Sequence, residues 1–263
     1  QNLADFIRIL GPDRPDTFTS RSTLAGAYQA AGKLDQAIPL FEQNLEDRSR
    51  TLGPAHPVTL TSRGNLAGAY REAGRLDEAI RLFGDNLEAS IRILGPHDPR
   101  TLTSRDHLAG TYRDAGRLDE AIPLFERNLT DFTRLAGPDH LDALTSRGNL
   151  ACAYQDAGRL DEAIALFERN LTDFIRILGP DHPETLAWRD KLAGAYQAAS
   201  RLDEAIALFE QNLTDFIRIL GPEHPETLAS RGNLAGAYQA AGRLDQAIPL
   251  LQQNLEDRTR ILG

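Results

Sequence analysis

The sequence predicts an all-α solenoid of stacked antiparallel helix pairs, and three observations lead to this. The stretch from Arg63 to Phe83 recurs six times with small changes, at a fixed spacing of 42 residues. Each period carries two apolar stripes at helical spacing. A fixed period of this length is typical of an array in which each unit packs on its neighbour. Gly-Pro pairs mark the period at 11–12, 53–54, 95–96, 137–138, 179–180 and 221–222.

The period also divides the chain. Residues 1–10 match the end of a repeat, so we expect them to form the partial second helix of a truncated one. Because the chain opens inside a repeat and contains no Met, we expect it to be a fragment of a longer protein. Six 42-residue helix-turn-helix repeats then form one array, at 11–52, 53–94, 95–136, 137–178, 179–220 and 221–263.

The repeat at 53–94 shows how each helix is expected to begin and end. Gly53 suits the left-handed position after a helix, and Pro57 suits the first turn of the next one, here named helix A. Gly74 ends helix A after about 17 residues, roughly 25 Å. Asp77 is expected to be the N-cap of the second helix, named helix B. The short turn between the two helices makes them antiparallel.

Composition limits the function. Of the 263 residues, 41% are hydrophobic, and the formal charge of −9 argues against binding to a phosphate backbone. The single cysteine, Cys152, allows no internal disulfide and fits a reducing compartment, so a cytoplasmic location is expected. The sequence contains no run of 18 apolar residues, so it predicts no membrane-spanning helix. No Gly-rich phosphate loop, nucleophile elbow or Cys/His cluster appears, so we expect neither an enzyme nor a cofactor.

Each repeat keeps a small set of residues, which in the second repeat are Leu66, Ala67, Tyr70, Ala79 and Phe83. They match the Leu, small residue, Tyr, Ala and Phe in the pattern of the tetratricopeptide repeat, which the chain resembles along essentially its whole length, although an Arg stands at the Trp position of that pattern. The period of 42 residues is longer than the usual 34 and is similar to that of the repeats in kinesin light chains and in actinobacterial arrays attached to signalling NTPases. The resemblance implies a right-handed superhelix whose concave groove is lined by helix A. It also implies protein or peptide binding without catalysis.

The spacing indicates which side chains face the groove. If Leu66, Ala67 and Tyr70 face helix B, the small and polar side chains of helix A face away from helix B. Five glycines recur at one such position, 26, 68, 110, 194 and 236, and mid-helix Gly costs about 1 kcal/mol against Ala. They are explained by helix packing or by the close approach of a ligand. The candidate peptide-binding residues are Thr23, Gln29, Asn65, Gly68, Arg71, His107, Arg113, Asn149, Gln155, Lys191, Gln197, Asn233 and Gln239.

Asn65, Asn149 and Asn233 form an interrupted ladder in this set. An Asn amide both donates to and accepts from an extended peptide backbone, although these side chains are also explained as solvated polar residues. Lys191 alone is too little for a basic clamp on a C-terminal carboxylate, so that interpretation is rejected. Cys152 replaces a groove Gly and is interpreted as a small packing residue rather than a nucleophile.

Two further residue series have structural explanations. A buried guanidinium needs acceptors, so we expect an ion-pair ladder between repeats, with phosphate or carboxylate binding as the alternative. The arginines are Arg21, Arg63, Arg105, Arg147, Arg189 and Arg231, and the expected partners on the preceding helix B are Asp47, Asp131, Asp173 and Asp215. The loop histidines are expected to cap helices rather than bind metal, because equivalent residues of stacked repeats lie about 10 Å apart. They are His56, His97, His140, His182 and His224.

Three functions remain open. The first is a scaffold that binds a peptide or protein segment in the groove. The second is a structural array that stacks end to end, because apolar residues at both ends lack the polar outer face of a capping repeat. The third is the sensor or regulatory arm of a larger signalling NTPase. The apolar end residues are Leu3, Phe6, Ile7 and Leu10, and Leu250, Leu251, Leu255, Ile261 and Leu262.

Overall fold

The computed structural model describes residues 14–262, so the partial helix expected at 1–10 lies outside the described part. Within that part the chain forms twelve α-helices and no strand, which confirms the all-α prediction. The helices A are α2 (Pro15–Ala30), α4 (Pro57–Glu72), α6 (Pro99–Asp114), α8 (Leu141–Asp156), α10 (Pro183–Ala198) and α12 (Pro225–Ala240). The helices B are α3 (Leu34–Leu52), α5 (Leu76–Leu94), α7 (Leu118–Ala136), α9 (Leu160–Leu178), α11 (Leu202–Leu220) and α13 (Leu244–Leu262).

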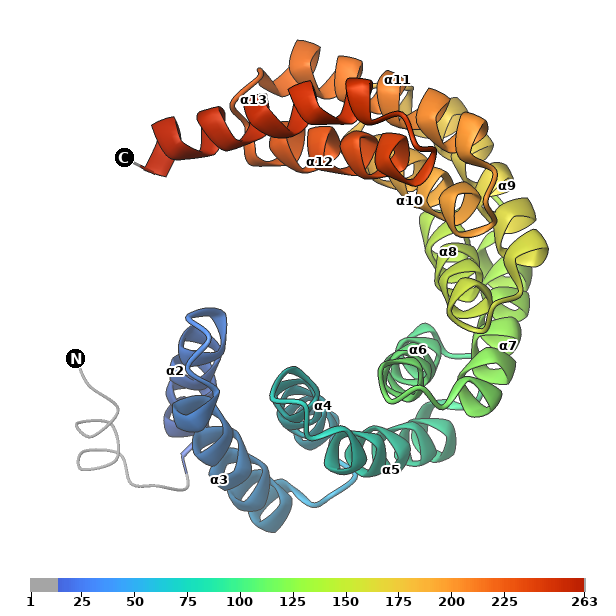
Figure 1. Ribbon diagram of the computed structural model, residues 1–263. Helices are drawn as coiled ribbons and strands as arrows, with labels where there is room; N and C mark the ends of the chain where they lie inside the picture. Colours follow the sequence, from blue (N-terminus) through green and yellow to red (C-terminus); the bar gives the residue numbers. More distant parts are fainter. Residues whose placement is uncertain (1–13, 263) are drawn as a thin grey trace. The chain divides into compact units, whose positions relative to one another are not determined.

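The helices belong to two compact units, residues 1–132 and 133–263, each described by itself. In the first unit α2, α3, α4, α5 and α6 pack in chain order, each against the next. In the second unit α8 to α13 do the same. Figure 1 shows helices A and helices B alternating along each unit. Of the described helices, none combines the length and the apolar content that a membrane crossing needs.

Helix A begins and ends as the sequence predicts. Pro57 occupies the first turn of α4, and the Nδ1 atom of His56 accepts a hydrogen bond from the backbone N–H of Val58. At the other end Gly74 has a φ of +73°, and the Arg75 N–H bonds the Tyr70 carbonyl at 2.8 Å. This left-handed closure satisfies the last carbonyls of the helix and turns the chain toward helix B.

The expected N-cap of helix B is wrong. Helix α5 begins at Leu76, its N-cap is Arg75, and no side chain caps it. Asp77 lies one residue inside the helix, in the first turn, where its charge complements the helix dipole. The Arg75 guanidinium instead bonds Glu78 at 2.8 and 2.9 Å and lies 4.1 Å from the centroid of the Tyr70 ring. The turn is therefore held by an arginine that bridges both helices.

The core of each unit lies between the helix A and helix B layers. In the second unit it is formed by residues such as Phe167, Leu192, Tyr196 and Phe209, all nearly excluded from solvent. The first unit buries the equivalent Phe41, Tyr70 and Phe83. Recurrence of the same apolar positions places the opposite side of each helix A at the surface.

Candidate functional site

Each unit has a helix A face, meaning the accessible surface of α2, α4 and α6 in the first unit and of α8, α10 and α12 in the second, and these faces carry the candidate binding residues. All thirteen of them are exposed or partly exposed, as expected for a surface set. Their accessibility leaves them able to contact another molecule, so the following paragraphs take their intramolecular partners in turn.

Some of these side chains link neighbouring helices A. Gln29 donates to the Glu72 carboxylate at 2.6 Å, and the Arg71 Nε donates to Asp114 at 2.5 Å. The Asn233 amide donates to both Asp190 oxygens at 3.0 and 3.1 Å. In each case the partner lies 43 residues away, on the adjacent helix A. These residues join repeats together besides facing the surface.

Other candidates have no hydrogen-bond partner within residues 14–262. The Gln155, Gln197 and Gln239 amides make no intramolecular bond in that part of the chain. For Gln155 and Gln197 the reason is sequence: Ala198 and Ala240 stand where Glu72 faces Gln29. These three amides are therefore available to an incoming peptide backbone.

Three more candidates lie against rings or their own helix. His107 packs on Phe83 with ring centroids 5.4 Å apart, and burial lowers the pKa of its imidazole, with the Arg71 cation adding to the effect. The Lys191 Nζ lies 5.5 Å from the Trp188 ring centroid. The Thr23 hydroxyl donates to the carbonyl four residues earlier at 3.0 Å. Arg113 and Asn149 also have partners within the chain.

The recurring helix A glycines are not explained by packing. A Cβ added at Gly26, Gly68, Gly194 or Gly236 would meet no atom within 4 Å. At Gly110 it would meet only the flexible Arg71 guanidinium at 3.4 Å. The packing interpretation is therefore wrong at four of the five positions. Close approach by a ligand stays a prediction, since it would account for a residue that costs helix stability.

One buried glycine of a helix A does have a packing role. A Cβ at Gly148 would lie 1.9 Å from the Trp188 ring, which crosses from α10 onto α8. Trp188 stacks on Phe174, with centroids 5.8 Å apart and planes at 22°, and lies near Phe167 at 6.2 Å. This aromatic cluster fills the space between α8, α9 and α10.

The equivalent space between α4, α5 and α6 is empty. Ser90 stands where Phe174 stands in the later repeat, and Ser104 stands where Trp188 does. The result is a cavity of about 490 Å³, here named the N-terminal pocket. Its apolar walls come from Val58, Leu60 and Ile93, and its polar lining includes Asn65, Asn86, Arg100 and His107.

An unsatisfied acceptor lines the N-terminal pocket. Asn86 is 9% exposed, and its Oδ1 atom has no hydrogen-bond partner. In the next repeat the equivalent Asn128 Oδ1 accepts from Arg105 at 3.1 Å. Arg63, the equivalent arginine here, is half-buried and donates to the Pro54 carbonyl at 3.2 Å, as Arg105 does to the Pro96 carbonyl at 3.1 Å. A buried acceptor without a donor costs stability unless a ligand supplies the donor.

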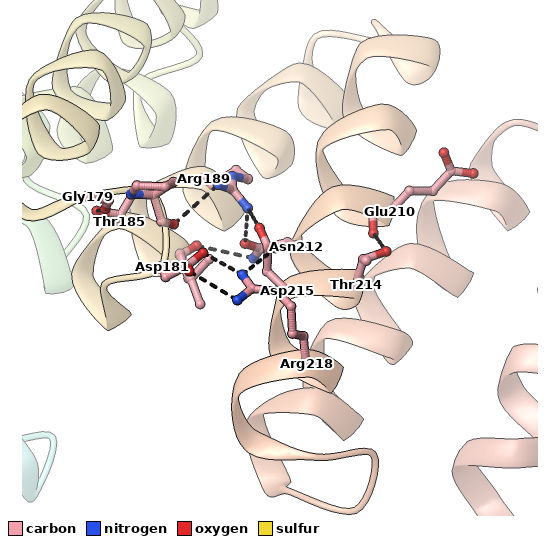
Figure 2. Close-up of polar contacts among 11 residues, drawn as sticks. Gly179, Asp181, Thr185, Arg189, Glu210, Asn212, Thr214, Asp215 and Arg218 are labelled. Atoms are coloured by element: carbon pink, nitrogen blue, oxygen red, sulfur yellow. Dashed lines mark hydrogen bonds and ion pairs between the residues drawn. The ribbon is translucent and has the colours of Figure 1, made fainter.

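The ion pairs expected of the arginine series form, but within a repeat rather than between repeats. Arg189 of α10 is 2% exposed and pairs at 2.6 Å with Asp215 of α11, the helix B that follows it (Figure 2). Arg218 reaches the same carboxylate at 3.0 Å and also bonds Asp181. The same pairing joins Arg21 to Asp47, Arg105 to Asp131, Arg147 to Asp173 and Arg231 to Asp257.

The Asp215 carboxylate shows how the pairs work. Burial raises its pKa, but hydrogen bonds from Arg189 and Arg218 outweigh burial and hold the pKa below its usual value. Arg189 also bonds the Asn212 amide oxygen at 3.4 Å. Five of the six guanidinium groups are enclosed and paired with Asp, so the alternative of phosphate binding is wrong for these five. Arg63 lacks the pair because Ala89 replaces the Asp.

The loop histidines cap helices A, with one exception. His56, His140, His182 and His224 each accept at Nδ1 from a backbone N–H two residues later. His97 stands one residue earlier than its counterparts, so Asp98 caps α6 and the His97 Nδ1 lies 3.2 Å from Asp131. Residues 14–260 contain no group of three metal-ligating side chains.

Sequence reasoning missed two recurring polar pairs. The Tyr70 hydroxyl donates to Glu42 and the Tyr196 hydroxyl to Glu168, both at 2.5 Å. In each case the glutamate lies on the helix B of the preceding repeat. Tyr238 bonds Glu210 in the same way. The signal was present, because a Glu recurs 28 residues before a Tyr. The buried Asn series was also missed: Asn128, Asn212 and Asn254 each donate to a helix A carbonyl at 2.9 to 3.2 Å.

The sequence and fold were compared with known proteins. A search of curated proteins found no match. Among solved structures, one similar chain is a Podosopora anserina kinesin light chain protein whose TPR-like repeats are nearly identical to one another. It is 34% identical to this chain, with a TM-score of 0.71, and the match covers 78% of this chain and 98% of that one. BtubC (BKLC) from P. vanneervenii shares the fold at 20% identity and a TM-score of 0.72, over 88% of this chain and 92% of that one.

A third structure is a STAND protein with a tetratricopeptide repeat sensor from Pyrococcus horikoshii. It is 16% identical, with a TM-score of 0.69 over 98% of this chain and 39% of that one, and so shows the fold alone. The tetratricopeptide repeat pattern itself matches residues 16–89, 64–130, 100–172, 153–214 and 187–260. Because these matches span the six repeats described above, the chain belongs to the tetratricopeptide repeat family.

Proposed function

We propose that the helix A face binds an extended peptide or protein segment and that the N-terminal pocket receives one of its side chains. The observation that carries this is the 490 Å³ cavity left by Ser90, with the unpartnered Asn86 oxygen in its lining. An apolar pocket with a few convergent polar groups is the usual form of a recognition site. On this proposal the protein is a non-catalytic scaffold.

Two other features of the helix A face support the proposal. The glycines at 26, 68, 194 and 236 leave open space beside the backbone, which lets a ligand main chain approach closely. The free Gln155, Gln197 and Gln239 amides offer donors and acceptors that suit a main chain of any sequence. Together they fit a ligand held by its backbone along the face and selected by side chains in pockets.

The test fills the pocket with the residue used elsewhere in the chain. Ser90→Phe restores the phenylalanine found at 132, 174 and 216, so it buries apolar surface and is expected to raise the free energy of unfolding by about 1 to 2 kcal/mol. Peptides selected from a displayed library on the unaltered chain are expected to bind this variant at least tenfold more weakly. Calorimetry or fluorescence anisotropy gives the affinities.

The matched control is Glu88→Phe, which adds the same bulk at an exposed position of α5 outside the pocket. Its affinity for the selected peptides should not change. Equal binding by Ser90→Phe and the unaltered chain would remove the N-terminal pocket from the account. Failure to select any peptide on the unaltered chain would count against the proposed function itself.

A second candidate function, end-to-end self-association, is favoured by the last described helix. In α13, Leu244 is 53% exposed, Ile248 51% and Leu255 68%. Their spacing places them on one side of the helix, where earlier helices B pack on the next helix A. A second copy of the chain could cover this stripe in a contact that repeats from copy to copy.

A further inference from the structure

A second pocket lies at the position of the N-terminal pocket, three repeats further along the chain. It is lined by α10, α11 and α12, has a volume of about 330 Å³ and is here named the C-terminal pocket. Phe216 occupies the place of Ser90, Asp190 that of Gly64, and Glu226 that of Arg100. The two pockets therefore share one location in the repeat but differ in charge.

The C-terminal pocket presents two carboxylates. Asp190 is partly buried, and its contacts include the neutral Asn233 amide at 3.0 and 3.1 Å. Burial raises the pKa of Asp190, while hydrogen bonds from Asn233 and Asn212 oppose the rise. Glu226 is exposed in the first turn of α12, and its carboxylate has no side-chain partner in the described part of the chain. Both groups would gain from a cation brought into the pocket.

An unsatisfied hydroxyl marks the floor of this pocket. Ser230 is 2% exposed, and its Oγ atom has no hydrogen-bond partner. Two of the equivalent hydroxyls in the first unit are satisfied, Ser104 by Ser90 at 3.4 Å and Ser62 by the Arg48 guanidinium at 2.7 Å. The chain itself thus shows a guanidinium donating to this serine position. In the C-terminal pocket Phe216 replaces that arginine, so the donor is absent.

We propose that the C-terminal pocket binds the guanidinium group of an arginine side chain belonging to the segment held on the helix A face. The inference rests on the proposed function and names one feature of its ligand. A guanidinium has five donors in a planar fork and no acceptor, which suits a pocket that offers Asp190, Glu226 and the Ser230 oxygen. The Phe216 ring supplies an aromatic surface on which such a group can lie.

The charges around the pocket support a cationic ligand, with one opposing group. Residues 133–263 hold 19 Asp and Glu against 13 Lys and Arg, whereas residues 1–132 hold 19 against 16. Lys191 lines the pocket and repels a cation, although its amine lies over Trp188. Removing Lys191 should therefore strengthen the binding of a guanidinium, an effect opposite in sign to that of removing an acid.

The experiment uses the full chain and a probe that occupies the pocket alone. The probe is N-acetyl-arginine amide, and N-acetyl-citrulline amide is its neutral counterpart of the same shape. Titrations followed by amide chemical shifts are expected to give a dissociation constant on the order of 1 mM for the arginine compound. Citrulline should bind at least about tenfold more weakly, because it lacks the charge that makes these hydrogen bonds strong.

Three variants locate the site. Glu226→Gln should weaken arginine binding about fivefold, since charge-assisted bonds are roughly twice as strong as neutral ones. Lys191→Gln should strengthen arginine binding about threefold, because it removes a positive charge that repels the guanidinium. The matched control is Glu184→Gln, at the same position of α10, where Trp188 fills the adjacent space. Ser230→Ala, which removes only the unpartnered hydroxyl, should weaken binding about twofold without loss of thermal stability.

The outcomes separate the two proposals. Equal binding of arginine and citrulline, or unchanged binding by Glu226→Gln, overturns the guanidinium site and leaves the peptide-binding proposal untouched. Binding that follows the three variants, on a chain for which no library peptide can be selected, keeps the guanidinium site and removes the peptide-binding function. If both tests succeed, the selected peptides should contain an arginine whose replacement by citrulline reduces their affinity.

Discussion

At the scale of single residues, the arginine in the middle of each helix A depends on the residue 26 positions later. Where that residue is Asp, as at 215, the guanidinium turns inward and is enclosed. Where it is Ala, as at 89, the equivalent arginine, Arg63, is only half-buried. One substitution in helix B thus changes the burial of an arginine on the helix A that it packs against.

Asp215→Ala tests the buried pair. It leaves the 2%-exposed Arg189 without its carboxylate, so the free energy of unfolding is expected to fall by about 3 kcal/mol, measured by urea denaturation. The matched control is Arg63→Met, where no such pair exists, with an expected loss below about 1 kcal/mol.

The pH dependence follows from the lowered pKa of Asp215. A carboxyl with a depressed folded pKa stabilises fully above its unfolded pKa of about 3.9, and this stability is lost as the pH falls through the folded pKa. The difference between Asp215→Ala and the unaltered chain should therefore shrink below about pH 4. A difference that stays constant down to pH 2 would contradict the ion pair.

The glycines of helix A give a second test at this scale. Gly148→Ala places a methyl group where the Trp188 ring lies 1.9 Å away, so it should destabilise the protein by about 2 kcal/mol or more. Gly232→Ala, whose Cβ would meet only Asn254 at 3.6 Å, should stabilise it by about 1 kcal/mol through helix propensity. Thermal unfolding of both variants gives the two signs, and equal shifts would refute the packing of Trp188 on α8.

At the scale of helices, three tyrosines of helices A bond a glutamate on the helix B of the preceding repeat. Tyr238 of α12 is almost fully buried and bonds Glu210 of α11, and Tyr196 of α10 bonds Glu168 of α9. Burial and the carboxylate partner raise the pKa of each of these phenols to about 12. In the first unit Gly84 replaces the Glu that would face Tyr112, so this link is missing there.

Stability should fall in alkali for this reason. Because the folded pKa is about 12 and the unfolded pKa about 10, each pair contributes fully below pH 10 and loses its contribution as the pH rises to 12. The expected loss is about 2 kcal/mol for each tyrosine, measured as the free energy of unfolding at pH 9 and pH 11.5.

Tyr238→Phe is the control for the alkaline effect. The variant keeps the ring but cannot ionise, so its stability should fall less between pH 9 and pH 11.5 than that of the unaltered chain. An identical fall in both proteins would show that Tyr238 does not titrate with the predicted pKa.

At the scale of the whole molecule, the proposed end-to-end association would depend on the apolar stripe of α13. Two of the apolar end residues that the sequence singles out, Leu251 and Leu255, are exposed. Four others, Leu3, Phe6, Ile7 and Leu10, lie outside the described residues.

Ile248→Lys with Leu255→Lys should lower the mass measured by light scattering at high concentration. Ile217→Lys with Ile219→Lys adds the same charge on α11 and should not. A concentration-independent monomer mass for the unaltered chain would remove self-association from consideration.

The sequence by itself determined the helix pairs, the helix A starts at Pro and the surface position of the candidate residues. These follow from backbone chemistry and from a strict period, both of which act locally. It did not determine the N-cap of helix B, because the Arg75 contact with Tyr70 competes with Asp77. It also assigned Asp215 to the wrong repeat, since a period of 42 does not say which neighbour a helix packs against.

Only the tertiary structure decided where the surface is hollow. Ser90, Ser104 and Trp188 are each ordinary residues of a helix, and a pocket forms or closes according to which of them meet across three helices. Likewise the Asn86 oxygen and the Ser230 hydroxyl become unsatisfied only when packing excludes water from them. The helix pairs therefore follow from local sequence pattern, whereas the pockets depend on packed volume and burial, which no single repeat encodes.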